Sequence, residues 1–104
     1  MLTVVETLTF QRLVADVWNE DERLEFISWI AANETAGDVI KEIGGLRKVR
    51  WNRPGMGKSG GARVIFFSRG ERGDLVLLLI YTKAKFDNIP AKTLRKLKEA
   101  INGA

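Results

Sequence analysis

Neither cysteine nor histidine occurs among the 104 residues of this chain. The lack of cysteine excludes a disulfide framework and thiolate chemistry, and it favours a reducing compartment, so we expect the protein in the cytoplasm. The lack of histidine removes the commonest acid–base catalyst and a common metal ligand. Any chemistry must therefore use Lys, Arg, Tyr, Asp, Glu or the backbone.

Long hydrophobic runs are also missing. The longest, at residues 75–81, is far too short to cross a bilayer, and the N-terminus lacks the basic-then-apolar layout of a signal peptide. We therefore expect no membrane contact. Apolar residues still make up 45% of the chain, which is enough for a core, and the length predicts a single domain over residues 1–104.

Charge is distributed unevenly along the chain. Residues 1–40 hold eight acidic and two basic side chains, a net charge of −6, whereas residues 41–104 hold fifteen basic and five acidic ones, a net charge of +10. A positive field concentrated in this way is typical of proteins that bind a polyanion, most often nucleic acid. The alternative interpretation is a solvated lysine-rich surface.

Hydrophobic periodicity predicts three helices and four strands. Apolar residues recur with helical spacing from Phe10 to Trp18. Asn19 and Glu22 predict a capping box before a second helix, and Pro90 opens a third. Alternating or continuous apolar patterns predict strands at 2–5, 46–51, 62–68 and 75–81. The order β-α-α-β-β-β-α indicates an α+β domain, with two N-terminal helices and a C-terminal helix packed on a small antiparallel sheet.

The stretch RPGMGKSGG at residues 53–61 is similar to a phosphate-binding loop. Its glycines fit G-x-G-x-x-G, and Gly57-Lys58-Ser59 matches the end of a P-loop whose first glycine is replaced by Asn52. Both motifs require a helix after the loop, and a strand is predicted there, so a nucleotide site is not expected. Glycines would let this backbone approach a polyanion closely, with Arg53 among the nearby cations. A flexible hairpin connection is the alternative.

Four segments carry a family pattern when they are taken together. They are GDVI at 37–40, GGLRKVRW at 44–51, GKSGGARVI at 57–65 and LLIYTK at 78–83. In this combination and order the chain resembles the RelE/HigB toxins of bacterial toxin–antitoxin modules. The resemblance extends over nearly the whole chain.

The resemblance implies an endoribonuclease that cuts messenger RNA in the ribosomal A site, uses neither a metal ion nor a cofactor, and is silenced by a cognate DNA-binding antitoxin. Arg63 matches the family arginine after the paired glycines and is expected to stabilise charge on the phosphate. Lys83 and Tyr81 are expected to assist with charge or proton transfer. The surrounding cations are expected to hold RNA phosphates: Arg47, Lys48, Arg50, Arg53, Lys58 and Lys85.

Several alternatives remain open. Arg63 could pair with a surface carboxylate, and Tyr81 could simply end a core strand. Some relatives carry a catalytic tyrosine in the C-terminal segment, and this chain has none after Tyr81, so the general acid or base is not assigned. ParE-type members of the superfamily share the architecture but poison DNA gyrase without nuclease activity. A non-catalytic RNA-binding module would have the same composition.

Overall fold

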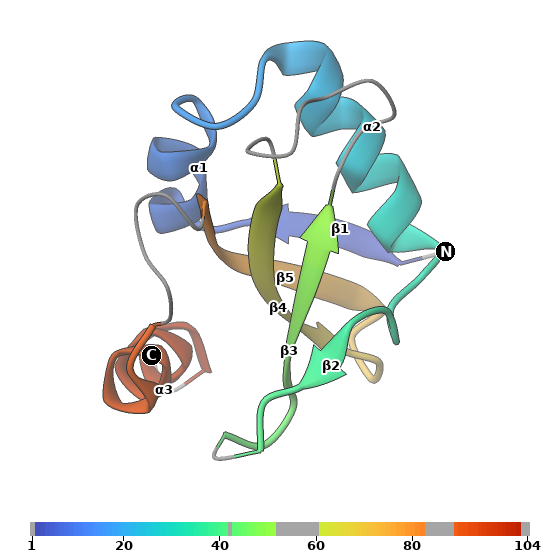
Figure 1. Cartoon of the computed structure of the whole chain (residues 1–104). Helices are drawn as coiled ribbons and strands as arrows, with labels where there is room; N and C mark the ends of the chain where they lie inside the picture. Colours follow the sequence, from blue (N-terminus) through green and yellow to red (C-terminus); the bar gives the residue numbers. More distant parts are fainter. Residues whose placement is uncertain (1, 42, 52–60, 83–88, 103–104) are drawn as a thin grey trace.

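The computed structural model describes residues 2–41, 43–51, 61–82 and 89–102. In this part of the chain a five-stranded sheet lies between helices (Figure 1). The elements are β1 Thr3–Glu6, α1 Leu8–Val14, α2 Glu20–Ala31, β2 Asp38–Val39, β3 Leu46–Trp51, β4 Ala62–Arg69, β5 Asp74–Thr82 and α3 Ala91–Asn102. The predicted α+β class and the order of the helices and longer strands are confirmed, and β2 is an additional short strand.

The strands lie side by side in the order β1-β5-β4-β3-β2. The pairs β2–β3, β3–β4 and β4–β5 are antiparallel. β1 runs parallel to β5, from Thr3 opposite Asp74 to Glu6 opposite Leu77. The prediction of an antiparallel sheet is therefore wrong at this pair, and the sheet is mixed. After β1 the chain crosses one face of the sheet in α1 and α2 and enters the opposite edge at β2 (Figure 1), so no hairpin sets the direction of β1.

Helices cover both faces of the sheet. α1 and α2 pack on one face, where Phe10, Phe26 and Ile30 are fully buried against the inward residues of the strands. α3 packs on the other face, where Leu94 joins a second cluster with Leu46 and other strand residues. No helix in the described part of the chain is long and apolar enough to cross a membrane.

Specific side chains fix where the first two helices begin. The capping box of α2 is confirmed, because Asn19 Oδ1 accepts a hydrogen bond from Glu22 N at 2.9 Å and Glu22 Oε1 accepts one from Asn19 N at 3.0 Å. Thr7 caps α1 by accepting from Phe10 N at 3.1 Å, and its buried hydroxyl also donates to Leu77 O at 2.9 Å. The hydrogen bond from the Thr7 hydroxyl to Leu77 O therefore links the start of α1 to β5.

Helix α1 is shorter than its apolar pattern predicts. It ends at Val14, and the next residues form a turn in which Val17 N and Trp18 N both donate to Val14 O. Trp18 is nevertheless only 5% exposed and packs in the core of the α1–α2 face. The spacing of apolar residues therefore indicates which side chains are buried, and here the buried side chains continue past the end of the helix.

In the described part of the chain, β4 is the next element after β3. A strand therefore follows the glycine-rich stretch, as predicted, and the helix N-terminus that a phosphate-binding loop requires is not the next element. Alternation along β3 is also confirmed. Val49 belongs to the core of the α1–α2 face, so Lys48 and Arg50 on either side of it face the α3 side.

Candidate functional site

Three neighbouring strands align polar side chains in a row across the α3 face of the sheet. Arg63 in β4 lies directly opposite Arg50 in β3 on one side and Tyr81 in β5 on the other. Their neighbours Val64 and Ile80 are buried on the α1–α2 face, so alternation places the row on the α3 face. We call Arg50, Arg63 and Tyr81 the cross-strand row.

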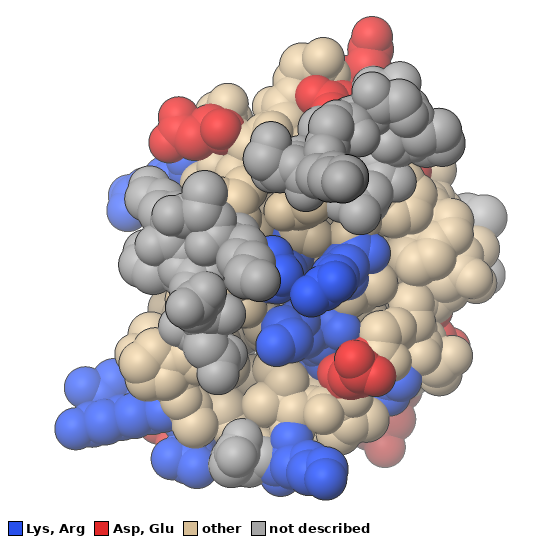
Figure 2. All heavy atoms as spheres, viewed as in Figure 1, with Lys and Arg blue, Asp and Glu red and all other residues tan. Residues whose placement is uncertain are grey.

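Lys48 extends this arrangement along β3. It lies two residues from Arg50 on the same face and opposite Ile65 of β4. Lys48, Arg50 and Arg63 form what we call the basic patch. Figure 2 shows lysine and arginine side chains gathered in a hollow of this face, over the strands that carry these residues.

The basic patch has no acidic partner in the part of the chain that the structure describes: Lys48, Arg50 and Arg63 form no ion pair there. Elsewhere arginines are paired, since Arg23 lies 2.7 Å from carboxylate oxygens of both Glu6 and Glu20. Like charges directly opposite each other destabilise a sheet. The facing pair Arg50 and Arg63 therefore costs stability, which is typical of a site that receives an anion.

Helix α3 leaves the patch uncovered because it packs on the other end of this face. The ammonium of Lys98 lies 5.7 Å from the centroid of the Phe67 ring and donates to the carbonyl of Gly44. Phe67 pairs with Leu46, four residues before Arg50 along β3. The C-terminal helix thus covers the Leu46 end of the sheet and leaves the Arg50 end open.

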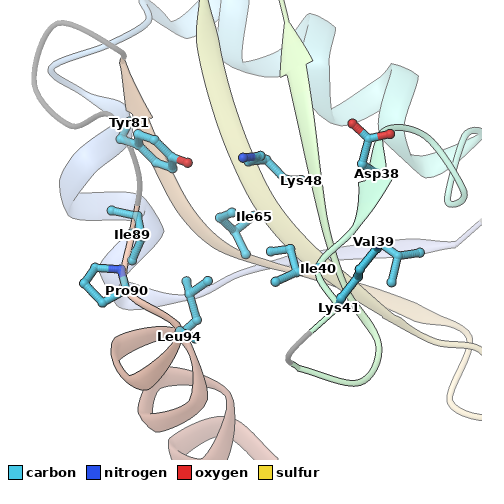
Figure 3. Close-up of a pocket in the computed structure, with 11 residues that line it drawn as sticks. Asp38, Val39, Ile40, Lys41, Lys48, Ile65, Tyr81, Ile89, Pro90 and Leu94 are labelled. Carbon is cyan, nitrogen blue, oxygen red and sulfur yellow. The ribbon is translucent and has the colours of Figure 1, made fainter.

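Tyr81 is almost fully buried at the end of the row, with 4% of its surface exposed. Burial raises the pKa of the Tyr81 phenol, and the positive charge of Arg63 partly opposes this shift. The phenol is therefore protonated at neutral pH and is available as a proton donor. Tyr81 does end a core strand, as the alternative interpretation has it, but its hydroxyl also points toward the Lys48 ammonium (Figure 3).

A pocket of about 700 Å³ adjoins the basic patch. Lys48, Ile65 and Tyr81 line it from the sheet, and the start of α3 closes one side with residues that include Leu94. The other wall consists of β2 and the residues after it, Asp38, Val39, Ile40 and Lys41. Figure 3 shows this wall facing α3 across the pocket.

Arg47, predicted to hold RNA, is not brought together with the basic patch. Its guanidinium donates to three backbone carbonyls before β2: Nη2 to Thr35 O at 2.6 Å and Gly37 O at 3.3 Å, and Nε to Ala36 O at 3.1 Å. Its place next to Lys48 in the strand puts it on the other face of the sheet. Arg47 therefore holds the connection between α2 and β2.

Four of the predicted site residues lie outside the described part of the chain: Arg53, Lys58, Lys83 and Lys85. The structure adds the Asp38–Lys41 wall, which sequence reasoning missed. Its only signal was the GDVI segment, because a strand of two residues is too short to show alternation.

Within the described ranges, no three carboxylates gather closely enough to hold a metal ion. No model of a known protein family matches the chain.

Proposed function

We propose that this protein is the toxin of a toxin–antitoxin module, and that it is a ribosome-dependent endoribonuclease which cuts messenger RNA without a metal ion. The cross-strand row carries the proposal. It places two cations that lack acidic partners in the described chain beside a protonated phenol. These groups suit two needs of RNA cleavage by its own 2′-hydroxyl, which are stabilisation of charge on the phosphate and a proton for the leaving oxygen.

In that reaction the 2′-oxygen attacks the neighbouring phosphorus, and the bond from phosphorus to the 5′-oxygen of the next nucleotide breaks. Negative charge grows on the non-bridging oxygens as the phosphorus passes through a five-coordinate state. Arg63 occupies the centre of the row, where its planar guanidinium can bind two of these oxygens. Arg50 and Lys48 lie on the same face as Arg63 and are suited to hold the phosphates on either side of the scissile one. The guanidinium of Arg50 can donate several hydrogen bonds to phosphate oxygens, and the ammonium of Lys48 supplies a compact positive charge.

Tyr81 is our candidate for the general acid. The departing 5′-oxygen needs a proton, and a phenol whose pKa is raised by burial keeps its proton until that oxygen takes it. The products are then a 2′,3′-cyclic phosphate and a free 5′-hydroxyl. Lys83, which was predicted to assist with charge or proton transfer, is the candidate to accept the proton of the 2′-hydroxyl, and it would do so as the neutral amine.

A toxin of this kind also requires a second chain that restrains it. The +10 charge of residues 41–104 would attract an acidic antitoxin segment and would speed its association at low salt. Such a segment would block the basic patch directly or exclude the ribosome by its bulk. The product of the adjacent reading frame is the natural candidate.

The test is to map cuts in a defined messenger RNA after incubation with the purified protein, with and without ribosomes, and with and without 1,10-phenanthroline, which binds transition-metal ions and leaves the Mg²⁺ that ribosomes need. We expect cuts only with ribosomes, at the same positions and rates in the chelator, and suppression by the candidate antitoxin. Tight RNA binding without any cut would favour the non-catalytic RNA-binding module. Inhibition of DNA gyrase without any cut would favour the ParE-type function.

A further inference from the structure

The pocket beside the basic patch combines an apolar floor with a polar rim. Ile40 just after β2, Ile65 of β4 and Leu94 of α3 supply aliphatic surface. Lys48 and Asp38 bring opposite charges to its rim. A volume of about 700 Å³ lies within the usual range for small-ligand sites and is ample for one nucleotide.

Asp38 is the single carboxylate that lines this pocket among the described residues. It lies directly opposite Lys48 in the β2–β3 register, so an ion pair between the two would be expected. No such pair forms within the described chain, and the Lys48 ammonium points instead toward the Tyr81 hydroxyl (Figure 3). The two oxygens of Asp38 therefore remain free to accept hydrogen bonds from a ligand.

The wall that carries Asp38 is held in place from outside the pocket. Arg47 binds the three carbonyls just before it, as described above. Gly37 adopts a φ of 75°, and a Cβ at this position would lie 2.1 Å from Lys48 O, so the backbone packs directly on β3. Asp38 thus follows a fixed point of the chain, so the backbone that carries its carboxylate is already in place before a ligand binds.

We infer that this pocket binds a nucleobase of the RNA strand and that Asp38 selects bases with an exocyclic amino group, cytosine, adenine and guanine, over uracil. This inference rests on the proposed function, because it places the scissile phosphate on the basic patch next to the pocket. Unstacked bases of single-stranded RNA are commonly bound on apolar surfaces and read by hydrogen bonds at their edges.

The selection follows from hydrogen-bond chemistry. A carboxylate accepts hydrogen bonds and cannot donate, so it matches the amino groups of cytosine and adenine. Uracil carries a carbonyl oxygen at the position where cytosine carries its amino group, and a carboxylate that reaches this position would meet a second acceptor. The N3–H of uracil lies between two carbonyl oxygens, so a carboxylate that accepts from it is also brought close to these oxygens. Cytosine and uracil are nearly identical in size and stacking, which makes them the sharpest comparison.

The test measures binding of 2′-O-methyl hexamers of cytidine and of uridine to the full chain by isothermal titration calorimetry, because the methyl group prevents cleavage. We expect the cytidine hexamer to bind about tenfold more tightly, a difference of about 1.4 kcal/mol, because only cytosine donates to the Asp38 carboxylate from its 4-position. Asp38→Asn should bring this ratio close to one, because the amide can both donate and accept. Asp16→Asn, which removes the same charge from an exposed residue beyond α1, is the matched control and should leave the ratio unchanged.

Equal binding of the two hexamers by the native protein would overturn the inference, and so would an unchanged ratio in Asp38→Asn. These outcomes are separate from those of the nuclease test. If the protein cuts messenger RNA on ribosomes but binds both hexamers equally, the base site is refuted and the proposed nuclease activity is supported. If the protein cuts no RNA but shows a base preference that depends on Asp38, the base site is supported and the nuclease activity is refuted.

Discussion

The arginines of this protein differ in role although they share one chemistry. Arg69 binds Asp74 through two hydrogen bonds of 2.8 and 2.9 Å, and Arg47 binds backbone carbonyls. Arg63 has no acidic partner in the described chain and faces another arginine across the strand pair. The role of each arginine is therefore set by the groups that the fold places around its guanidinium.

Arg63→Ala is expected to leave a folded protein that has lost most of its cleavage activity. Removing one donor to a transition-state oxyanion costs roughly 2–4 kcal/mol, so the rate of cleavage should fall about 10²- to 10³-fold. Single-turnover cleavage on ribosomes measures this rate, and circular dichroism checks the fold. Arg12→Ala, at an exposed position in α1, is the control and should cleave at the native rate. Native activity in Arg63→Ala would move the charge-stabilising role to another residue.

Tyr81 can be titrated alone because it is the sole tyrosine of the chain. Burial should place the midpoint of tyrosinate absorbance in the folded protein above the ordinary value of about 10, and urea should return it to that value. Arg63→Ala should raise the midpoint further, because the arginine favours the phenolate. A folded midpoint at or below the ordinary value would contradict the burial of the Tyr81 phenol in the folded protein.

The raised pKa of the Tyr81 phenol also makes the stability of the fold depend on pH. Above pH ~10 the phenol ionises in the unfolded chain before it ionises in the folded protein, so the free energy of unfolding should fall as the pH rises through this window. Tyr81→Phe should lack this part of the alkaline loss in urea unfolding curves at successive pH values. Its cleavage rate should be lower by about 10²-fold if the phenol is the general acid.

Sequence reasoning could place part of the site and not the rest. Alternation in β3 was enough to predict that Lys48 and Arg50 share a face, and the pattern of the four segments pointed to Arg63 and Tyr81. Arg47 was grouped with these cations because a sequence shows a positive charge but not the carbonyls that surround it. Asp38 was missed because its importance comes from the pocket, which four strands and α3 form together.

At the scale of elements, the connection between α2 and β2 determines the pocket wall. Gly37 is the point where this connection touches β3, and its φ of 75° is one that other residues adopt at a cost. The guanidinium of Arg47 then binds the carbonyls on the same short segment. One glycine and one arginine therefore set the position of Asp38.

Gly37→Ala is expected to destabilise the protein by at least about 1–3 kcal/mol, the usual cost of a strained backbone conformation, because the new Cβ would also collide with Lys48 O. Urea unfolding measures the loss. Gly44→Ala is the matched control, because a Cβ there meets no atom within 4 Å and the backbone is not left-handed. Equal stability of the two variants would show that the contact between Gly37 and β3 contributes little.

The sequence predicted helices and strands well where the pattern comes from residues that are neighbours along the chain. The Asn19 capping box and the bounds of β3 follow from neighbouring residues, and both are confirmed. The parallel pairing of β1 with β5 was not predictable, because Thr3 and Asp74 are far apart in sequence and no turn links their strands. The end of α1 was misplaced because apolar spacing continues through a buried turn.

At the scale of the whole molecule, charge is separated between the two faces. The acidic side chains of α2, among them Glu20, Asp21 and Glu22, belong to the helical layer on one face of the sheet. The basic patch and the lysine-rich α3 lie on the other face. A polyanion would therefore orient the protein with its sheet face and α3 inward, before any specific contact forms.

Binding to single-stranded RNA should accordingly weaken steeply with salt. The double variant Lys48→Ala/Arg50→Ala should reduce the slope of log K against log salt by about 1.4, because two phosphate contacts are lost. Lys92→Ala/Lys96→Ala, at exposed positions of α3, is a control of equal charge and should change the slope less. Identical slopes for the two double variants would mean that total charge binds RNA and that the basic patch holds no particular phosphate.

The parallel pairing of β1 with β5 also orders events while the protein is being made. β1 is synthesised well before its partner, which begins at Asp74, so β1 has no strand to pair with in the meantime. The cross-strand row needs Tyr81, near the end of that same strand. A nascent chain therefore cannot present an assembled site before β5 has been made, and the ribosome that produces the protein is not exposed to the proposed activity until then.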